Sequence, residues 1–153
     1  MTSRSAQLVP ILMAEDDEDD RMLFQDALQE SHFANPIYFV HDGEELIDFL
    51  RHKGKFIDPA TSPSPGLILL DLNMPKKDGR QALSEIKSDP MLCSIPIVVL
   101  TTSKEEQDVL RSYDLGVNSF IVKPVTFGKL LEVVTFIGKY WLELVRLPEP
   151  PQS

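Results

Sequence analysis

The stretch that decides the fold is Leu67-Ile68-Leu69-Leu70-Asp71-Leu72-Asn73-Met74-Pro75. Its four consecutive apolar residues are typical of a strand that is buried on both faces of a parallel sheet. Asp71 follows them directly, so one carboxylate is expected at the end of this strand. Ligands of open α/β folds bind outside the carboxyl ends of the strands. The stretch therefore predicts both a central strand and a functional site at its end.

Similar apolar runs recur along the chain and alternate with amphipathic segments of helical length, which predicts an α/β fold with a five-stranded parallel sheet covered on both faces. The expected strands are Pro10–Ala14, Ile37–Val40, Gly66–Asp71, Ile97–Thr101 and Ser119–Val122. The expected helices are Glu18–Glu30, Glu44–Arg51, Gly79–Lys87, Lys104–Asp114 and Phe127–Leu147. The segment between Gly54 and Gly66 contains Pro and Ser without an apolar period, and is expected to be a long surface loop, either a tolerated insertion or a partner contact.

The composition excludes several classes of protein. The 153 residues are 42% hydrophobic and 25% charged, which fits one globular domain. A net charge of -9 without a Lys/Arg stripe argues against nucleic-acid binding. The apolar stretches are too short for a signal peptide or a membrane span, which predicts a cytoplasmic protein. Cys93 is the single cysteine and cannot form an internal disulfide.

The last helix is expected to carry more apolar residues than one buried face can hide. A second stripe at three- and four-residue spacing marks an association surface. We therefore expect a homodimer through this helix, with a monomer as the alternative. The residues of this stripe are Val133, Phe136, Tyr140, Leu144 and Leu147.

The ends of four predicted strands carry residues suited to phosphoryl transfer. The carboxylate of Asp71 could attack phosphorus to form an acyl phosphate. Glu15 and Asp16 could anchor Mg²⁺, which would bridge the negative charges of nucleophile and phosphoryl group. Lys123 would supply a fixed cation, and the hydroxyl of Thr101 could sense the new oxygens. The acids from Asp17 to Asp20 are better explained as the N-terminus of a helix.

Together these residues resemble the response-regulator receiver domain of two-component signalling, over roughly residues 8–142. The resemblance implies a flavodoxin-like (βα)5 sheet of order 2-1-3-4-5, for which the chemotaxis member of this family is a known example. It also implies that Asp71 is the phosphoacceptor and that Thr101 is the hydroxyl switch. The implied metal ligands for Mg²⁺ or Mn²⁺ are Glu15, Asp16, Asp71 and the backbone carbonyl of Asn73. The remaining implied roles are phosphate pairing by Lys123, a rotating aromatic ring at Phe120 and a cis peptide before Pro124.

Within this family, the chain resembles small stand-alone regulators that are paired with phytochrome-type histidine kinases. The similarity rests on the loop Lys76-Lys77-Asp78-Gly79-Arg80, the insertion before the third strand and the extended last helix. It implies a sensor histidine kinase as partner and a phosphorylation switch, not an enzyme beyond self-phosphorylation and autodephosphorylation. Residues 1–147 are expected to form one receiver domain, followed by a Pro-rich tail at 148–153.

Two other classes of site were weighed against the switch. Phosphatases with an aspartyl nucleophile carry an Asp-x-Asp motif, whose second Asp is the general acid. Here Asn73 occupies the place of that second Asp and cannot act as a general acid. A calcium loop over Asp16–Asp20 would lack the central Gly and the terminal bidentate Glu. Both alternatives are therefore disfavoured.

Overall fold

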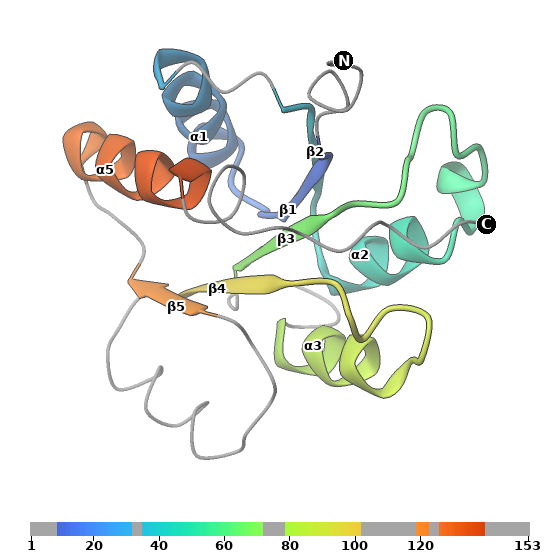
Figure 1. Ribbon diagram of the computed structural model, residues 1–153. Helices are drawn as coiled ribbons and strands as arrows, with labels where there is room; N and C mark the ends of the chain where they lie inside the picture. Colours follow the sequence, from blue (N-terminus) through green and yellow to red (C-terminus); the bar gives the residue numbers. More distant parts are fainter. Residues whose placement is uncertain (1–8, 32–34, 72–78, 102–118, 123–125, 140–153) are drawn as a thin grey trace, which may run out of the picture.

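The computed structural model describes residues 9–31, 35–71, 79–101, 119–122 and 126–139 (Figure 1). The strands are β1 (Ile11–Ala14), β2 (Ile37–Val40), β3 (Leu67–Asp71), β4 (Ile97–Thr101) and β5 (Ser119–Val122). The helices are α1 (Glu18–Glu30), α2 (Gly43–Leu50), the short 3-10 helix η1 (Gly54–Phe56), α3 (Gly79–Ser88) and α5 (Phe127–Ile137). The expected helix over Lys104–Asp114 lies outside the described residues.

All five strands run parallel in the order β2-β1-β3-β4-β5, which confirms the predicted fold. β3 lies in the middle, where it pairs with β1 on one side and β4 on the other. Every residue of β3 is buried. Its unbroken apolar run is thus explained by two-sided burial, since no residue of the strand can face water.

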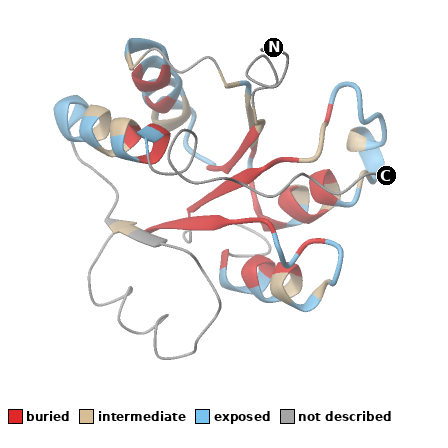
Figure 2. Ribbon diagram, in the orientation of Figure 1, coloured by how far each residue is buried: buried red, intermediate tan, exposed pale blue. Residues whose placement is uncertain are grey.

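Two helical layers cover the sheet, one on each face (Figure 1). Alternate strand residues divide between two cores, because successive side chains of a strand point to opposite faces. Leu12, Ile68 and Val99 pack with α2 and α3, whereas Met13 and Leu69 pack with α1 and α5. Figure 2 shows the buried residues concentrated on the strands and on the inner sides of these helices.

In the part of the chain that the structure describes, three helices begin with a side-chain cap. Asp17 accepts hydrogen bonds from the backbone N–H groups of Asp19 and Asp20 at the start of α1. Asp42 accepts from the N–H of Glu45 in α2, and Thr126 accepts from that of Lys129 in α5. Such caps satisfy N–H groups that have no partner inside the helix. They fix the points at which the chain turns from strand edge to helix.

The segment between α2 and β3 is more ordered than the predicted surface loop. It begins with η1, whose Phe56 ring packs on Phe49 of α2 at a centroid distance of 5.1 Å. Ser62, near its end, is 4% exposed. The aromatic contact could not be read from the Pro/Ser-rich composition, because it depends on which face of α2 is left open beside the sheet.

The last helix packs against α1 and carries two exposed aromatic rings, those of Phe127 and Phe136. Val133 is half-buried and packs against the core, whereas Phe136 is 51% exposed. The π-helical residues Gly138 and Lys139 follow α5. Tyr140, Leu144 and Leu147 lie outside the described residues, so the association stripe stays a prediction. In the described part of the chain, none of the helices has the length and apolar content needed to cross a bilayer.

Gly66 stands where the chain enters β3 and tests how tightly this strand is packed. Its N–H donates to the carbonyl of Pro10, and a Cβ atom added here would overlap the side chain of Val9. We expect Gly66→Ala to lower the free energy of unfolding by about 1–3 kcal/mol, because overpacking forces neighbouring atoms to move. Urea unfolding followed by circular dichroism measures this.

Gly128→Ala is the matched control, since an added Cβ there has no atom within 4 Å. It should leave stability unchanged or raise it by up to about 1 kcal/mol, because Ala favours helix more than Gly does. Equal effects of the two substitutions would contradict the close packing of β3 at Gly66.

Candidate functional site: a carboxylate cluster at the sheet edge

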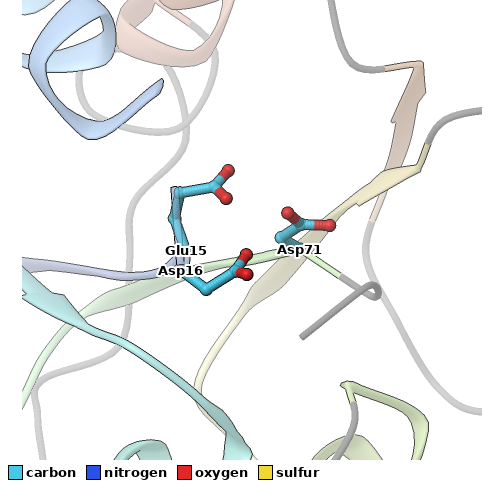
Figure 3. Close-up of side chains that lie close together, drawn as sticks. All are labelled: Glu15, Asp16 and Asp71. Atoms are coloured by element: carbon cyan, nitrogen blue, oxygen red, sulfur yellow. The ribbon is translucent and has the colours of Figure 1, made fainter. Parts of the chain in front are cut away.

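Three carboxylates from two strand ends meet at one edge of the sheet. Glu15, Asp16 and Asp71 each offer an oxygen, and these oxygens lie within 4.8 Å of one another (Figure 3). Glu15 is 0% and Asp71 is 2% exposed, whereas Asp16 is exposed. The structure thus brings together the three acidic side chains that the sequence predicted as one site.

Strand register places these residues side by side. Ala14 of β1 is the partner of Leu70 in β3, so the next residues, Glu15 and Asp71, leave their strands at the same level. The N–H of Glu15 donates to the carbonyl of Val40 at 3.0 Å, which holds the start of the β1–α1 connection against β2. The cluster is therefore a consequence of parallel pairing in this register.

The acids that follow have a different role. The N–H of Asp17 donates to Oε2 of Glu15 at 3.2 Å, and the side chain of Asp17 caps α1. Glu18, Asp19 and Asp20 lie in the first turn, where negative charge interacts favourably with the helix dipole. The interpretation of these acids as a helix N-terminus is confirmed, and within the described ranges the cluster consists of Glu15, Asp16 and Asp71.

Charge repulsion makes this cluster a candidate cation site. Two ionised carboxylates at 4.8 Å, such as Glu15 and Asp71, repel by about 3 kcal/mol at an effective dielectric constant near 20. A divalent cation bound between the carboxylates would replace this repulsion by attraction to the ion. Mg²⁺ is commonly held by one or two carboxylates, phosphate oxygens and water, and Mn²⁺ prefers the same oxygen ligands. The donor set fits either ion.

Other predicted site residues are described only in part. The backbone of Thr101 ends β4, and β4 pairs with β3 so that Leu100 is the partner of Asp71. The backbone of Phe120 lies in β5. Asn73, Lys123 and Pro124 lie outside the described residues. Parallel pairing thus brings the end of β4 to the same edge as the carboxylates, one residue beyond the level of Asp71.

A polar network beside the cluster was missed by sequence reasoning. Arg21 of α1 donates from Nη1 to Nδ1 of His41 at 3.0 Å, and the N–H of His41 donates to Oε1 of Glu45. Glu45 also pairs with Lys55 at 2.6 Å. Burial raises the pKa of Glu45, but the hydrogen bonds and charges of Lys55 and His41 outweigh it, so this pKa lies below its usual value. Tertiary contacts join Arg21 to His41 and Lys55 to Glu45, whereas His41 and Glu45 are only four residues apart in the sequence.

Comparison with protein families assigns the fold and the cluster together. A family model described as the response regulator receiver domain matches residues 11–135, including all described strands. The chain belongs to the response regulator receiver domain family. A receiver domain is a phosphoryl-accepting module, and the resemblance noted from the sequence is confirmed.

Several relatives of this receiver domain are themselves response regulators. The response regulator Rcp1 of Synechocystis sp. is 45% identical over 138 residues, which are 90% of this chain and 92% of that protein. The crystal structure of the phosphorylated cyanobacterial phytochrome response regulator RcpA matches with a TM-score of 0.83 at 44% identity, covering 94% and 100% of the two chains. An Mn²⁺-bound structure of Rcp1 matches with a TM-score of 0.81 at 44% identity, covering 92% and 99%.

The geometry of the cluster predicts that divalent cations stabilise this receiver domain. Ligands that bind only the folded state stabilise it by about 2.7 kcal/mol at 100 times their dissociation constant. We expect Mn²⁺ or Mg²⁺ to raise the melting temperature and excess chelator to reverse the increase. Differential scanning fluorimetry over a metal titration measures both effects.

The variants Glu15→Gln and Asp71→Asn should lose most of this metal-dependent increase, because each replaces a ligand carboxylate by a neutral amide. Asp26→Asn removes an exposed carboxylate from the middle of α1 and serves as the control, with the full increase retained. The same metal response in all three variants would show that the ion binds elsewhere.

Proposed function

We propose that Asp71 accepts a phosphoryl group from a sensor histidine kinase and that Glu15 and Asp16 hold the divalent cation for this transfer. The observation that carries the proposal is the meeting of one strand-end aspartate with two further carboxylates within 4.8 Å. A lone carboxylate would repel the incoming phosphoryl group. A cluster that can hold a dication removes that barrier.

The proposed transfer is a direct displacement at phosphorus. A carboxylate oxygen of Asp71 forms the new P–O bond while the P–N bond to the phosphohistidine donor breaks, and the electron pair of that bond stays on the imidazole. The product is an acyl phosphate on Asp71. Burial of Asp71 to 2% limits access by bulk water, which favours a lifetime long enough for signalling.

The other members of the site complete the proposal. Mg²⁺ is the proposed ion, with Mn²⁺ as an alternative that the Mn²⁺-bound structure of Rcp1 supports. The backbone carbonyl of Asn73 is proposed as a further ligand of the ion. Lys123 would pair with the phosphoryl oxygens, and Thr101 would hydrogen-bond to them and so sense the modified state. Phe120 is the proposed rotating ring, and the peptide before Pro124 the proposed cis bond.

A phytochrome-type kinase is the proposed partner. Support comes from RcpA, which is a cyanobacterial phytochrome response regulator and is 44% identical to this chain. We further propose residues 1–147 as one receiver domain with a tail at 148–153, acting in the cytoplasm. A homodimer through the last helix is proposed from the apolar stripe that includes the half-exposed Phe136.

The assignment of Asp71 is tested by phosphorylation with a small donor. Incubation with Mg²⁺ and acetyl phosphate, followed by a phosphate-affinity gel, should shift the wild-type protein and Asp26→Asn. Asp71→Asn should show no shift, because an amide lacks the negatively charged oxygen that attacks phosphorus. Equal labelling of Asp71→Asn would assign the phosphoryl group to another residue, and turnover of a generic phosphomonoester would instead favour a hydrolase.

The partner is tested by phosphotransfer from purified histidine kinases. We expect one phytochrome-type kinase to lose its phosphoryl group to this protein at least tenfold faster than other kinases do, as judged by short time courses on gels. Chelation of divalent cations should abolish the transfer. Faster transfer from a kinase without a phytochrome module would overturn the proposed pairing while leaving Asp71 as the acceptor.

A further inference from the structure

We propose that a cavity at the opposite edge of the sheet binds a small organic carboxylate with an apolar body. The cavity has a volume of about 300 Å³ and lies where α2 ends and where the chain enters β3 and β4. Sites for small ligands commonly begin at about this volume. The carboxyl ends of the strands, where Asp71 lies, are at the other edge, so this cavity is separate from the carboxylate cluster.

The walls of the cavity are apolar and come from three segments of the chain. Leu50 ends α2, Pro65 precedes β3, and Leu92 and Ile95 belong to the loop after α3. All four are buried, whereas Met91 at the same site is 60% exposed. A mostly apolar lining with a few polar groups is the usual composition of a small-molecule site. These walls would hold an aromatic ring or a branched aliphatic group.

His52 occupies a backbone position in this cavity that favours glycine. The end of α2 forms a Schellman motif, in which the N–H of Lys53 donates to the carbonyl of Asp48 at 2.9 Å and that of His52 to Phe49 at 3.3 Å. The residue after the helix cap is then left-handed, and His52 has φ of 55°. A side chain with a Cβ is strained there, so a histidine in place of glycine points to a use for the imidazole.

The imidazole of His52 has unused hydrogen-bonding capacity. Its Nε2 atom lies 3.4 Å from Oγ of Ser64, which also lines the cavity. Its Nδ1 atom is buried and has no hydrogen-bond partner among the described residues. Leaving a buried polar atom unpaired is costly, which is why such atoms are nearly always bonded. A rotation of the ring that turns Nδ1 toward the cavity would let a ligand oxygen accept its hydrogen bond without any change in the backbone.

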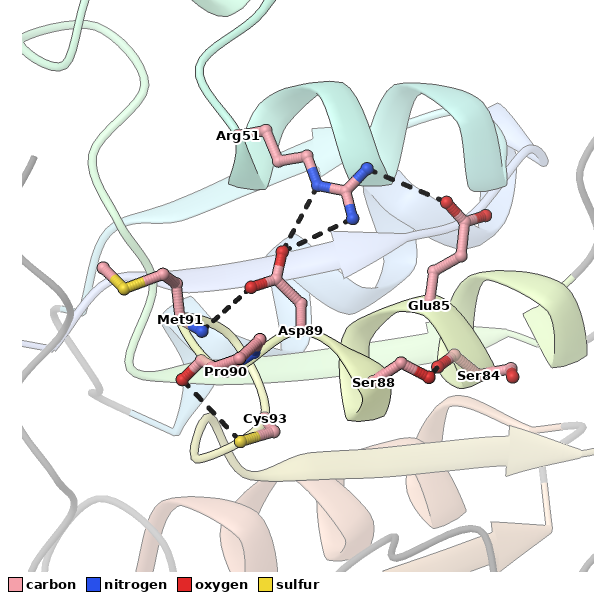
Figure 4. A network of polar contacts seen from close by, with 8 residues as sticks. All are labelled: Arg51, Ser84, Glu85, Ser88, Asp89, Pro90, Met91 and Cys93. Carbon is pink, nitrogen blue, oxygen red and sulfur yellow. Dashed lines mark hydrogen bonds and ion pairs between the residues drawn. The ribbon is translucent and has the colours of Figure 1, made fainter.

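The charged groups of the cavity favour an anion. Arg51 and Lys53 line it with one acid, Asp89, in a protein whose net charge is -9. Arg51 reaches Oδ2 of Asp89 from Nε and Nη2, both at 3.4 Å, and Glu85 at 3.8 Å (Figure 4). These contacts are longer than the 2.7–2.9 Å of strong charge-assisted bonds, so the guanidinium can still engage a ligand carboxylate.

Lys53 adds a second cation. It is exposed, and its ammonium group makes no ion pair within the part of the chain that the structure describes. A carboxylate between Arg51, Lys53 and His52 would place its apolar body against Leu50, Leu92 and Ile95. The cations thus account for the negative charge of the proposed ligand, and the apolar walls account for its apolar group.

Three probes of matched shape test the proposal: 3-phenylpropionate, the neutral 3-phenylpropanol and the cationic 3-phenylpropylamine. Each is titrated into ¹⁵N-labelled protein and followed by amide chemical shifts. We expect saturable shifts for 3-phenylpropionate with a dissociation constant of about 1 mM or lower, largest at residues 50–53, 64–66 and 91–95. The alcohol and the amine should bind at least tenfold more weakly. Equal binding of all three probes, or shifts centred elsewhere, would overturn the proposal.

The variant His52→Gly separates ligand binding from folding, because glycine adopts the left-handed backbone without strain. It should melt at the same or a higher temperature and bind 3-phenylpropionate at least fivefold more weakly. Unchanged binding by His52→Gly would show that the imidazole does not contact the ligand and would overturn the inference.

Asp71→Asn is the second matched variant. It should bind 3-phenylpropionate like the wild type, because the carboxylate cluster is at the other edge of the sheet. Tighter binding by Asp71→Asn would show that the anion enters the carboxylate cluster instead, because the substitution removes a negative charge that repels it there. This outcome is independent of whether Asp71 accepts a phosphoryl group.

Discussion

The parallel pairing of β3 with β1 and β4 is the constraint on which the rest of the structure depends. β3 is buried on both faces, and its partners fix it at one register, with Leu70 beside Ala14 and Asp71 beside Leu100. A shift by one residue would send every side chain of the strand to the other face and move Asp71 away from Glu15. The hydrophobic core and the functional edge are therefore set by the same backbone hydrogen bonds.

Burial of acidic groups at this edge conflicts with folding and serves function. Glu15 and Asp71 are nearly inaccessible, and the desolvation of an ionised carboxylate is unfavourable. The proposed dication at this strand edge would offset that cost. Neighbouring acids have different roles at this edge: Asp17 caps α1, whereas Glu15 and Asp16 belong to the carboxylate cluster.

The opposite edge of the sheet departs from local rules in a different way. The sequence between Gly54 and Gly66 predicted a surface loop, yet the ring of Phe56 packs against that of Phe49 and the end of this segment lines the cavity. His52 holds a left-handed position that glycine usually takes. Neither feature has a periodic signal: the aromatic contact depends on how the segment after α2 folds back on this helix, and the left-handed residue belongs to the C-cap of α2.

The sequence by itself determined the five strands, the helices α1, α2 and α3, the start of α5 and the identity of the acidic residues, because burial on both faces leaves an apolar run and a strand end leaves a lone carboxylate. The resemblance to receiver domains supplied the strand order. Only the tertiary structure decided that Glu15, Asp16 and Asp71 lie within 4.8 Å of one another, and that Arg21, His41, Glu45 and Lys55 form a chain of contacts. Such proximities depend on register and helix packing, which act between segments far apart in the sequence and leave no local pattern.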